Sequence, residues 1–158
     1  INLTTELVGD VIAEALKHIH KKSEMQKITV IQQDELLLAK MDARLIVQVL
    51  INLLDNAIKY TPSDSQITIT AKKDGNMISV SVSDNGNGIA DEQKSRVFDM
   101  FYTGTNKIAD SRRSIGLGLS LCKSIINAHG GEITITDNVP HGAVFTFTLP
   151  IGEVEIHE

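Results

Sequence analysis

The sequence predicts an α+β fold, a two-layer sandwich in which a mixed β-sheet carries about three helices on one face. Two observations lead to this class. Segments with apolar residues at three- and four-residue steps, typical of amphipathic helices, are interspersed with segments in which apolar and polar residues alternate, as in half-buried strands. At 158 residues the chain is long enough for one domain of this kind, 1–158, and we expect its core to span about residues 5–150.

The first half of the chain predicts two helices and two short strands. Apolar residues at helical spacing predict a helix over 5–19, capped by Thr4 or Thr5. The stretches KITVIQQ and ELLLAKMD predict strands. Asp42 is a suitable N-cap for a second helix over about 43–60, which ends before the next proline.

The second half predicts two hairpins around a third main helix. QITITAKK and MISVSVSD, separated by DGN, are typical of a hairpin. A short helix is expected near 91–97, and the polar segment 102–115 predicts a mobile loop. GLGLSLCKSIINAHGG predicts a helix that stops at a Gly-Gly C-cap. The alternating stretches EITITD and AVFTFTLP then close the domain, and GEVEIHE is expected to be a frayed tail.

The composition excludes several classes of protein. A net charge of -5 and a pI near 5.5 give no bulk attraction for nucleic acid or anionic membranes. The single cysteine, Cys122, excludes an intramolecular disulfide and fits a reducing compartment. No apolar run reaches the roughly 18 residues needed to span a bilayer. The chain starts without methionine, which suggests an excised fragment.

A polar stripe interrupts the apolar run of the 43–60 helix. Asn52, Asn56 and Lys59 fall at i, i+4 and i+7 and therefore share one face. A solvated face with an ion pair between Asp55 and Lys59 is one explanation. Asparagine is a poor helix former, however, so two on one stripe need a reason. An amide oxygen can ligate a hard cation such as Mg²⁺, and a nearby lysine can contact phosphate oxygens.

A glycine-rich segment, SDNGNGIA, follows the strand MISVSV. An ordinary Asx-Gly turn is one explanation, but the segment is too long and too rich in glycine for a tight hairpin. Gly86 and Gly88 would let the backbone approach a ligand closely. Asp84, at the end of the strand, could accept hydrogen bonds from an exocyclic amine such as that of adenine.

Gly116 and Gly118 lie at the start of the third helix. Close helix packing is one explanation, and a phosphate site is the other, because free N–H groups at a helix N-terminus bind anions. The pattern is not a P-loop, since no Gly-Lys-Ser/Thr follows, and not a Rossmann fingerprint, since the glycines follow a loop.

The 102–115 loop is a candidate lid because it is basic in an acidic protein. Three cations less one carboxylate leave a charge of +2; the residues are Lys107, Arg112, Arg113 and Asp110. The five histidines have no ligand-like spacing with cysteine or carboxylates, so none is expected to be catalytic.

In this order, NLLDNAIKYT, DNGNGI, FDMFY and GLGLSL resemble the N, G1, F and G2 boxes of the ATP-binding domain of histidine kinases. This Bergerat or GHKL fold is shared with gyrase-type topoisomerases, MutL-type proteins and Hsp90-type chaperones. Each box alone is a weak signal, whereas four in order are a strong one. The resemblance implies that the chain binds ATP and Mg²⁺.

The resemblance also implies a role for each box residue. Asn56 would ligate Mg²⁺, Asn52 would lie near the phosphates, and Lys59 would contact phosphate. Tyr60 would flank the base, and Asp84 would bind the adenine amine. A further set would complete the pocket and its lid: Gly86, Gly88 and Ile89 around adenine, Phe98 and Phe101 anchoring the lid, Lys107 within it, and Gly116, Leu117, Gly118 and Leu119 at its far hinge and at the phosphate-facing helix start.

Asn52 discriminates between branches of this superfamily. In the ATPase branches a glutamate at this position activates the attacking water, and an amide cannot accept that proton. The resemblance therefore implies a kinase that transfers the γ-phosphate to a histidine on a separate dimerisation domain. A nucleotide-sensing module without phosphotransfer, and an ATPase or anti-sigma-type serine kinase, are the alternatives on the same fold.

Three departures from the family pattern stand out. Thr103 replaces an arginine that often follows the F box, and Ala143 replaces a threonine that often follows the glycine of the last hairpin. The phosphoacceptor box is absent, since KHIHKKSEM does not match it. The chain thus resembles the catalytic part of a sensor kinase cut from its dimerisation helices.

The expected partners and location follow from that resemblance. A response regulator would act downstream, and this domain would contact neither nucleic acid nor membrane. The isolated domain would be a monomer, and it would be the cytoplasmic part of a membrane-anchored, homodimeric sensor. RRSIGLGLSLCKSIINAHGG and GAVFTFTLP resemble the potassium-responsive KdpD sensors somewhat more than the average family member.

Overall fold

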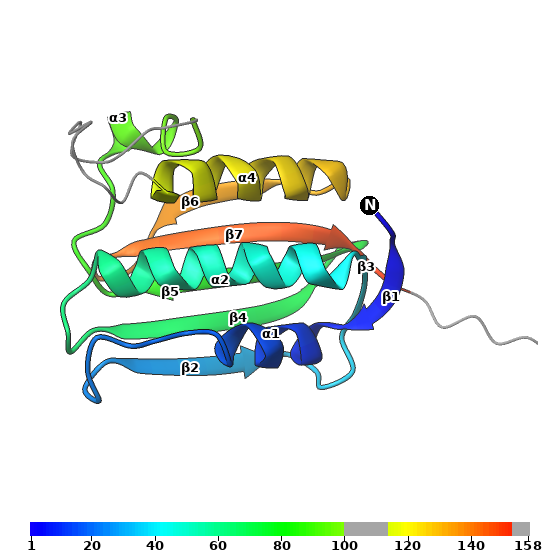
Figure 1. Cartoon of the computed structure of the whole chain (residues 1–158), viewed down its shortest axis with the longest axis horizontal. Coiled ribbons are helices and arrows are strands. Elements are labelled where there is room, and N and C mark those ends of the chain that lie inside the picture. Colours follow the sequence, from blue (N-terminus) through cyan, green and yellow to red (C-terminus); the bar gives the residue numbers. More distant parts are fainter. Residues whose placement is uncertain (100–113, 153–158) are drawn as a thin grey trace, which may run out of the picture.

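The structure, a computed structural model, describes residues 1–99 and 114–152, without the side chains of 114–117. The lid prediction therefore lies almost wholly outside the described residues, as does most of the predicted tail. Figure 1 shows the elements, which follow in this order: β1 (Thr4–Leu7), α1 (Val8–Leu16), β2 (Lys27–Gln32), β3 (Leu38–Met41), α2 (Ala43–Lys59), β4 (Gln66–Asp74), β5 (Met77–Asp84), α3 (Asp91–Lys94), α4 (Ser114–Ala128), β6 (Ile133–Asp137) and β7 (Ala143–Pro150).

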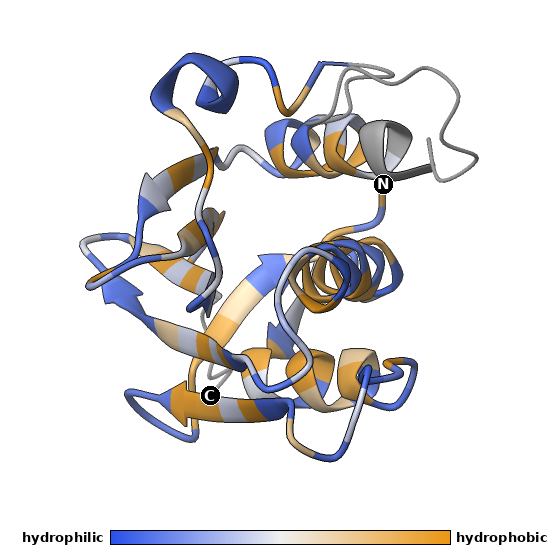
Figure 2. Cartoon of the chain, turned by 90° about the vertical axis from the view of Figure 1, so that its left-hand side faces the viewer, coloured by the Kyte–Doolittle hydropathy of each residue, from blue (hydrophilic) through white to orange (hydrophobic). Residues whose placement is uncertain are grey.

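The main sheet has five strands in the order β2-β4-β5-β7-β6. β2 pairs with β4 in parallel, and the other three pairs are antiparallel, so the sheet is mixed. Helices α1, α2 and α4 lie side by side on one face of this sheet, as Figures 1 and 2 show from two directions. The predicted α+β sandwich with helices on one face is confirmed.

The core lies between the helices and the sheet because both contribute an apolar face. In β4, β5 and β7, apolar residues at alternate positions point toward the helices, while serine and threonine occupy many of the positions between them. The buried residues of α2 are Ile46, Val49, Leu50, Leu53, Leu54, Ala57 and Ile58. Their burial fixes the rotation of α2, and this leaves the polar stripe of that helix turned away from the core.

The predicted helix over 5–19 is wrong at its start. Thr4–Leu7 form β1, which pairs antiparallel with β3, and the helix begins only at Val8. Neither predicted threonine caps it; Leu7 precedes the helix without a side-chain cap, and the Val8 N–H donates to the Leu37 carbonyl at 2.9 Å. Pairing with a distant strand satisfies backbone groups that a local cap would otherwise have to satisfy.

Smaller differences concern the other helices. Asp42 is the N-cap residue of α2, but its carboxylate makes no side-chain cap and instead accepts the Asn2 N–H at 3.1 Å. Helix α3 spans only Asp91–Lys94, shorter than the predicted 91–97.

Helix α4 buries its cysteine and ends at the predicted glycine pair. Cys122 is buried while Leu121 is exposed, and burial raises the pKa of the Cys122 thiol to about 12. Gly130, the second residue after α4, has a φ of 78°, as the Gly-Gly C-cap predicts. Within the described residues, no helix is both long and apolar enough to cross a bilayer.

Candidate functional site

The polar stripe of α2 faces the start of α4. Asn52 is half-buried, and its Nδ2 donates to the Gly118 carbonyl at 3.5 Å, while its Oδ1 accepts from Gln48 Nε2 at 3.2 Å. A Cβ atom built on Gly118 would lie 3.5 Å from Asn52 Cγ, which is ordinary van der Waals contact. The structure therefore brings together Asn52 and Gly118, which the sequence assigned to one site from positions 66 residues apart.

Asn56 lies one turn after Asn52 and is also half-buried. Among the described residues its side-chain amide has no hydrogen-bond partner. The backbone carbonyl of Asn56 accepts the N–H of Tyr60, which directly follows α2 and is 50% exposed. Lys59 is exposed in the last turn of the helix. The expected ion pair between Asp55 and Lys59 is not formed; partial burial raises the pKa of Asp55, against the opposing effect of the Lys59 charge.

Asp84 ends β5 as a buried carboxylate, 8% exposed. Its Oδ1 accepts the N–H of Gly86 at 2.9 Å and the N–H of Ala143 at 3.2 Å. Within the described part of the chain no hydrogen bond reaches Oδ2. One oxygen is thus anchored to the backbone of two loops, and the other is left to accept a hydrogen bond from a ligand.

The loop before β7 supports the glycine-rich loop after β5. Asn138 Nδ2 donates to the Asp84 carbonyl at 2.6 Å, and His141 Nδ1 lies 2.9 Å from the Gly86 carbonyl. Gly142, at φ 120°, lies so close that an added Cβ would come 2.0 Å from the Asp84 carbonyl oxygen. These contacts were not predicted from the sequence, in which their one signal is the Pro-His-Gly stretch between the last two strands.

Close packing also explains the two glycines of the loop after β5, Gly86 and Gly88. A Cβ on Gly86 would come 2.8 Å from Thr61 Cγ2, and one on Gly88, at φ 77°, would come 3.0 Å from the Gly142 carbonyl oxygen. Ile89 is half-buried and packs against the core. The predicted pocket residues of this loop therefore lie together beside Asp84.

The segment that begins with α3 is held to the edge of the sheet. Lys94 Nζ pairs with Asp137 at 2.8 Å and also with Asp91, and the two carboxylates, Asp137 first, raise the pKa of Lys94. Phe98 packs edge-on against Phe145, with ring centroids 6.2 Å apart and planes at 89°. Phe98 therefore holds this segment against the sheet, and its role as an anchor of the lid stays a prediction. Phe101 and Lys107 lie outside the described residues, and the surroundings of Gly116 and Leu117 are also not described.

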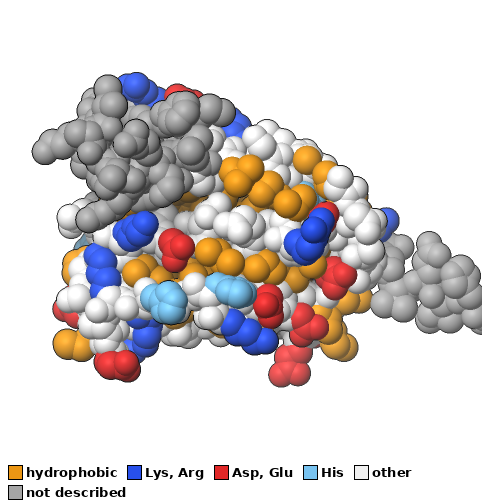
Figure 3. Space-filling view, in the orientation of Figure 1, with side chains coloured by type: hydrophobic (Ala, Val, Ile, Leu, Met, Phe, Trp, Pro, Cys, Tyr) orange, Lys and Arg blue, Asp and Glu red, His pale blue; other side chains and the backbone are white. Residues whose placement is uncertain are grey.

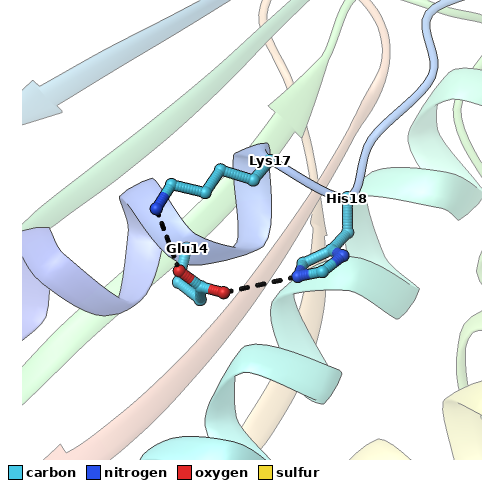
Figure 4. Close-up of polar contacts among 3 residues, drawn as sticks. All are labelled: Glu14, Lys17 and His18. Atoms are coloured by element: carbon cyan, nitrogen blue, oxygen red, sulfur yellow. Dashed lines mark hydrogen bonds and ion pairs between the residues drawn. The ribbon is translucent and has the colours of Figure 1, made fainter.

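A second polar cluster, drawn in Figure 4, lies away from these loops at the end of α1. Glu14 Oε2 is 3.3 Å from Lys17 Nζ, and Glu14 Oε1 is 3.4 Å from His18 Nε2. Hydrogen bonds from Lys17 and His18 lower the pKa of Glu14. All three side chains are about half exposed or more. Figure 3 shows charges of both signs interspersed over this helical face.

The oxygen ligands available at this site suit a Mg²⁺ ion that binds together with a phosphate-containing substrate. Within residues 1–99 and 114–152 there is no group of three or more His, Cys, Asp or Glu side chains that could hold a metal ion. The Asn56 amide oxygen alone would be a weak ligand. Mg²⁺ commonly binds through one or two protein oxygens together with water and substrate phosphates, which this arrangement permits.

Comparisons with known proteins agree on one family. Residues 41–153 match the family described as histidine kinase-, DNA gyrase B-, and HSP90-like ATPase. A sensor protein KdpD from Clostridium acetobutylicum is 41% identical over 150 residues, which are 95% of this chain but only 17% of that protein. This chain therefore corresponds to a small part of that relative.

Solved structures share the fold over nearly the whole chain. The nucleotide-free catalytic domain of histidine kinase ThkA matches with a TM-score of 0.83 and 32% identity, covering 96% of this chain and 97% of that one. ThkA in complex with the response regulator protein TrrA matches with a TM-score of 0.79 and 32% identity, covering 95% of this chain and 42% of the kinase.

Proposed function

Since the chain belongs to the family of histidine kinase-, DNA gyrase B- and HSP90-like ATPases, we propose that it is the catalytic domain of a sensor histidine kinase, transferring the γ-phosphate of Mg-ATP to a histidine on a separate domain. Asn52 carries this proposal. Its amide lies half-buried between α2 and α4, where a hydrolase of the superfamily would need a carboxylate. An amide cannot take a proton from water, so transfer is favoured over hydrolysis.

The adenine end of the nucleotide binds at Asp84. The N–H groups of Gly86 and Ala143 fix its Oδ1, so Oδ2 is held in place to accept a hydrogen bond from the exocyclic amine of adenine. Position 143 lacks the family's threonine hydroxyl, but its backbone N–H still orients the carboxylate. Tyr60 flanks the base, and Ile89 contributes to the apolar side of the pocket.

The phosphates bind where α2 meets the start of α4. Asn52 and Lys59 contact phosphate oxygens, and Asn56 would hold Mg²⁺, which would neutralise phosphate charge. The N-terminal turns of α4, which contain Gly116, Leu117, Gly118 and Leu119, would face the same anion, and Lys107 of the predicted 102–115 lid is proposed as a further phosphate contact. The domain thus works by positioning and charge neutralisation.

The acceptor and the downstream partner come from outside this chain. A histidine on the dimerisation domain of the same kinase receives the phosphoryl group, and a response regulator receives it next; the complex of ThkA with TrrA supports a regulator as partner. We propose 1–158 as one catalytic domain, on the cytoplasmic side of a membrane-anchored homodimer. The similarity to KdpD supports a KdpD-like sensor.

The test is to mix this domain with its cognate dimerisation domain and γ-labelled ATP. We expect label on the acceptor histidine, none when that histidine is replaced by glutamine, and none with Asn56→Ala. Binding of ATP without any labelled acceptor would favour the nucleotide-sensing module instead. Steady release of inorganic phosphate by this domain alone would favour the ATPase.

A further inference from the structure

A buried polar side chain lies behind the nucleotide site, in the segment between α1 and β2. Gln26 is fully buried, with 0% of its surface exposed. Its Nε2 lies 3.0 Å from Ser65 Oγ and 3.3 Å from Thr61 Oγ1, and its Oε1 accepts the Lys22 N–H at 2.9 Å. Gln26 thus joins the segment before β2 to the turn between α2 and β4.

Thr61 is held in one orientation by these bonds. Its Oγ1 donates to the Ala57 carbonyl at 2.6 Å, lies 2.7 Å from Ser65 Oγ, and is within reach of Gln26 Nε2. With the hydroxyl fixed in this way, the methyl group of Thr61 is directed at Gly86, since an added Cβ there would lie 2.8 Å from Thr61 Cγ2. Rotation about χ1 would break the hydroxyl contacts.

Gly86 is one of the two residues whose N–H groups hold Asp84, together with Ala143. Its N–H donates to Asp84 Oδ1 at 2.9 Å, so a shift of the Gly86 backbone moves or releases the carboxylate. A continuous series of contacts therefore leads from Gln26 through Thr61 and Gly86 to Asp84. We call Gln26, Thr61 and Ser65 the Gln26 brace.

Two further residues of the segment between α1 and β2 bind the turn between α2 and β4. Lys22 Nζ donates to the carbonyls of Lys59 and Thr61, at 2.7 Å each, and Ser23 Oγ donates to the Ser63 carbonyl at 2.6 Å. Burying polar groups is unfavourable unless they are satisfied, and an apolar side chain could fill the same space. The hydrogen bonds of Gln26 hold Thr61 in a single orientation, which an apolar side chain in the same place would not do.

We propose that Gln26 and Thr61 are positioning residues for adenine recognition, which set the place of Asp84 through the methyl contact with Gly86. This inference rests on the proposed function, in which Asp84 accepts the amine of adenine. Neither residue touches the nucleotide. Their effect is therefore expected in discrimination between bases, and not in binding of the phosphates.

The test compares ATP with inosine triphosphate, which carries a carbonyl oxygen in place of the exocyclic amine. Thr61→Ser keeps the hydroxyl and removes the methyl group; Gln26→Leu removes the polar connection at similar size. With Mg²⁺ present, we expect the ratio of ATP affinity to inosine triphosphate affinity to fall about threefold in both Thr61→Ser and Gln26→Leu, because both variants weaken the same methyl contact and a misplaced acceptor weakens a directed hydrogen bond. Affinity for inosine triphosphate should change less than about twofold.

Gln33→Leu is the matched control, because Gln33 Oε1 accepts the Lys73 N–H at 2.9 Å, near the end of β4 and away from Thr61 in the sequence. Its ratio should equal that of the unchanged chain. An unchanged ratio in the folded Thr61→Ser variant, or equal losses for both nucleotides, would overturn the inference. If the unchanged chain itself does not prefer ATP, the assignment of Asp84 fails, and the inference fails with it.

Discussion

Two carboxylates of this molecule look similar in the sequence and differ completely in the structure. Asp84 is 8% exposed, and backbone N–H groups of two loops hold its Oδ1. The side chain of Glu14 is 49% exposed, and it contacts two side chains on its own helical end, Lys17 and His18.

The difference shows what separates a binding site from a surface ion cluster. Fixed backbone donors orient a buried carboxylate without loss of side-chain entropy in the donor, and they leave its second oxygen for a ligand. Flexible exposed side chains around Glu14 contribute little and are screened by salt. Burial and backbone anchoring, more than charge, mark the site.

The largest expected effect comes from Asp84→Asn. The amide oxygen can still accept the N–H of Gly86, so the fold should persist, but the amide N–H₂ now faces the adenine amine. We expect ATP affinity to fall by at least about 100-fold. Calorimetric titration with Mg-ATP measures this, and circular dichroism checks the fold. ATP affinity within a few-fold of the unchanged chain would show that Asp84 does not bind the base.

Gly142→Ala breaks the anchoring itself. Its Cβ would meet the Asp84 carbonyl oxygen at 2.0 Å, so the backbone must shift, and we expect a loss of about 3 kcal/mol in the free energy of unfolding. Gly75→Ala is the matched control, because Gly75 also has a positive φ, 64°, but nothing lies within 4 Å of the added Cβ. It should cost about 1 kcal/mol. Urea unfolding of both variants measures the difference, and equal costs would contradict the close contact.

Glu14→Gln gives the smallest effect. The lowered pKa of Glu14 means that its stabilisation is present above the unfolded pKa, near 4.5, and is lost as the pH falls through the lower folded value. We therefore expect the melting temperature at pH 7 to fall by about 1 °C or less, and the two proteins to melt together at pH 2. ATP affinity should not change. A clear loss of ATP binding would place this cluster at the site after all.

Sequence patterning predicted the main sheet and the three large helices because each has a periodic apolar face that the structure buries. It missed β1, since Leu7 fits a helical period equally well and the strand depends on pairing with β3, more than 30 residues later. Likewise, the box residues were predictable from local stretches. The anchoring of Asp84 by residues 138–143 was not, because strand register places them together and no short motif encodes it.

The central claim is that α2 presents an Mg-ATP site through Asn56. The most direct measurement is a calorimetric titration of ATP into the unchanged chain and into Asn56→Ala, each with Mg²⁺ and with EDTA. We expect Mg²⁺ to strengthen binding to the unchanged chain and to have no such effect on Asn56→Ala, while both proteins unfold at similar temperatures. Equal ATP affinity of the two proteins in the presence of Mg²⁺ would contradict the account.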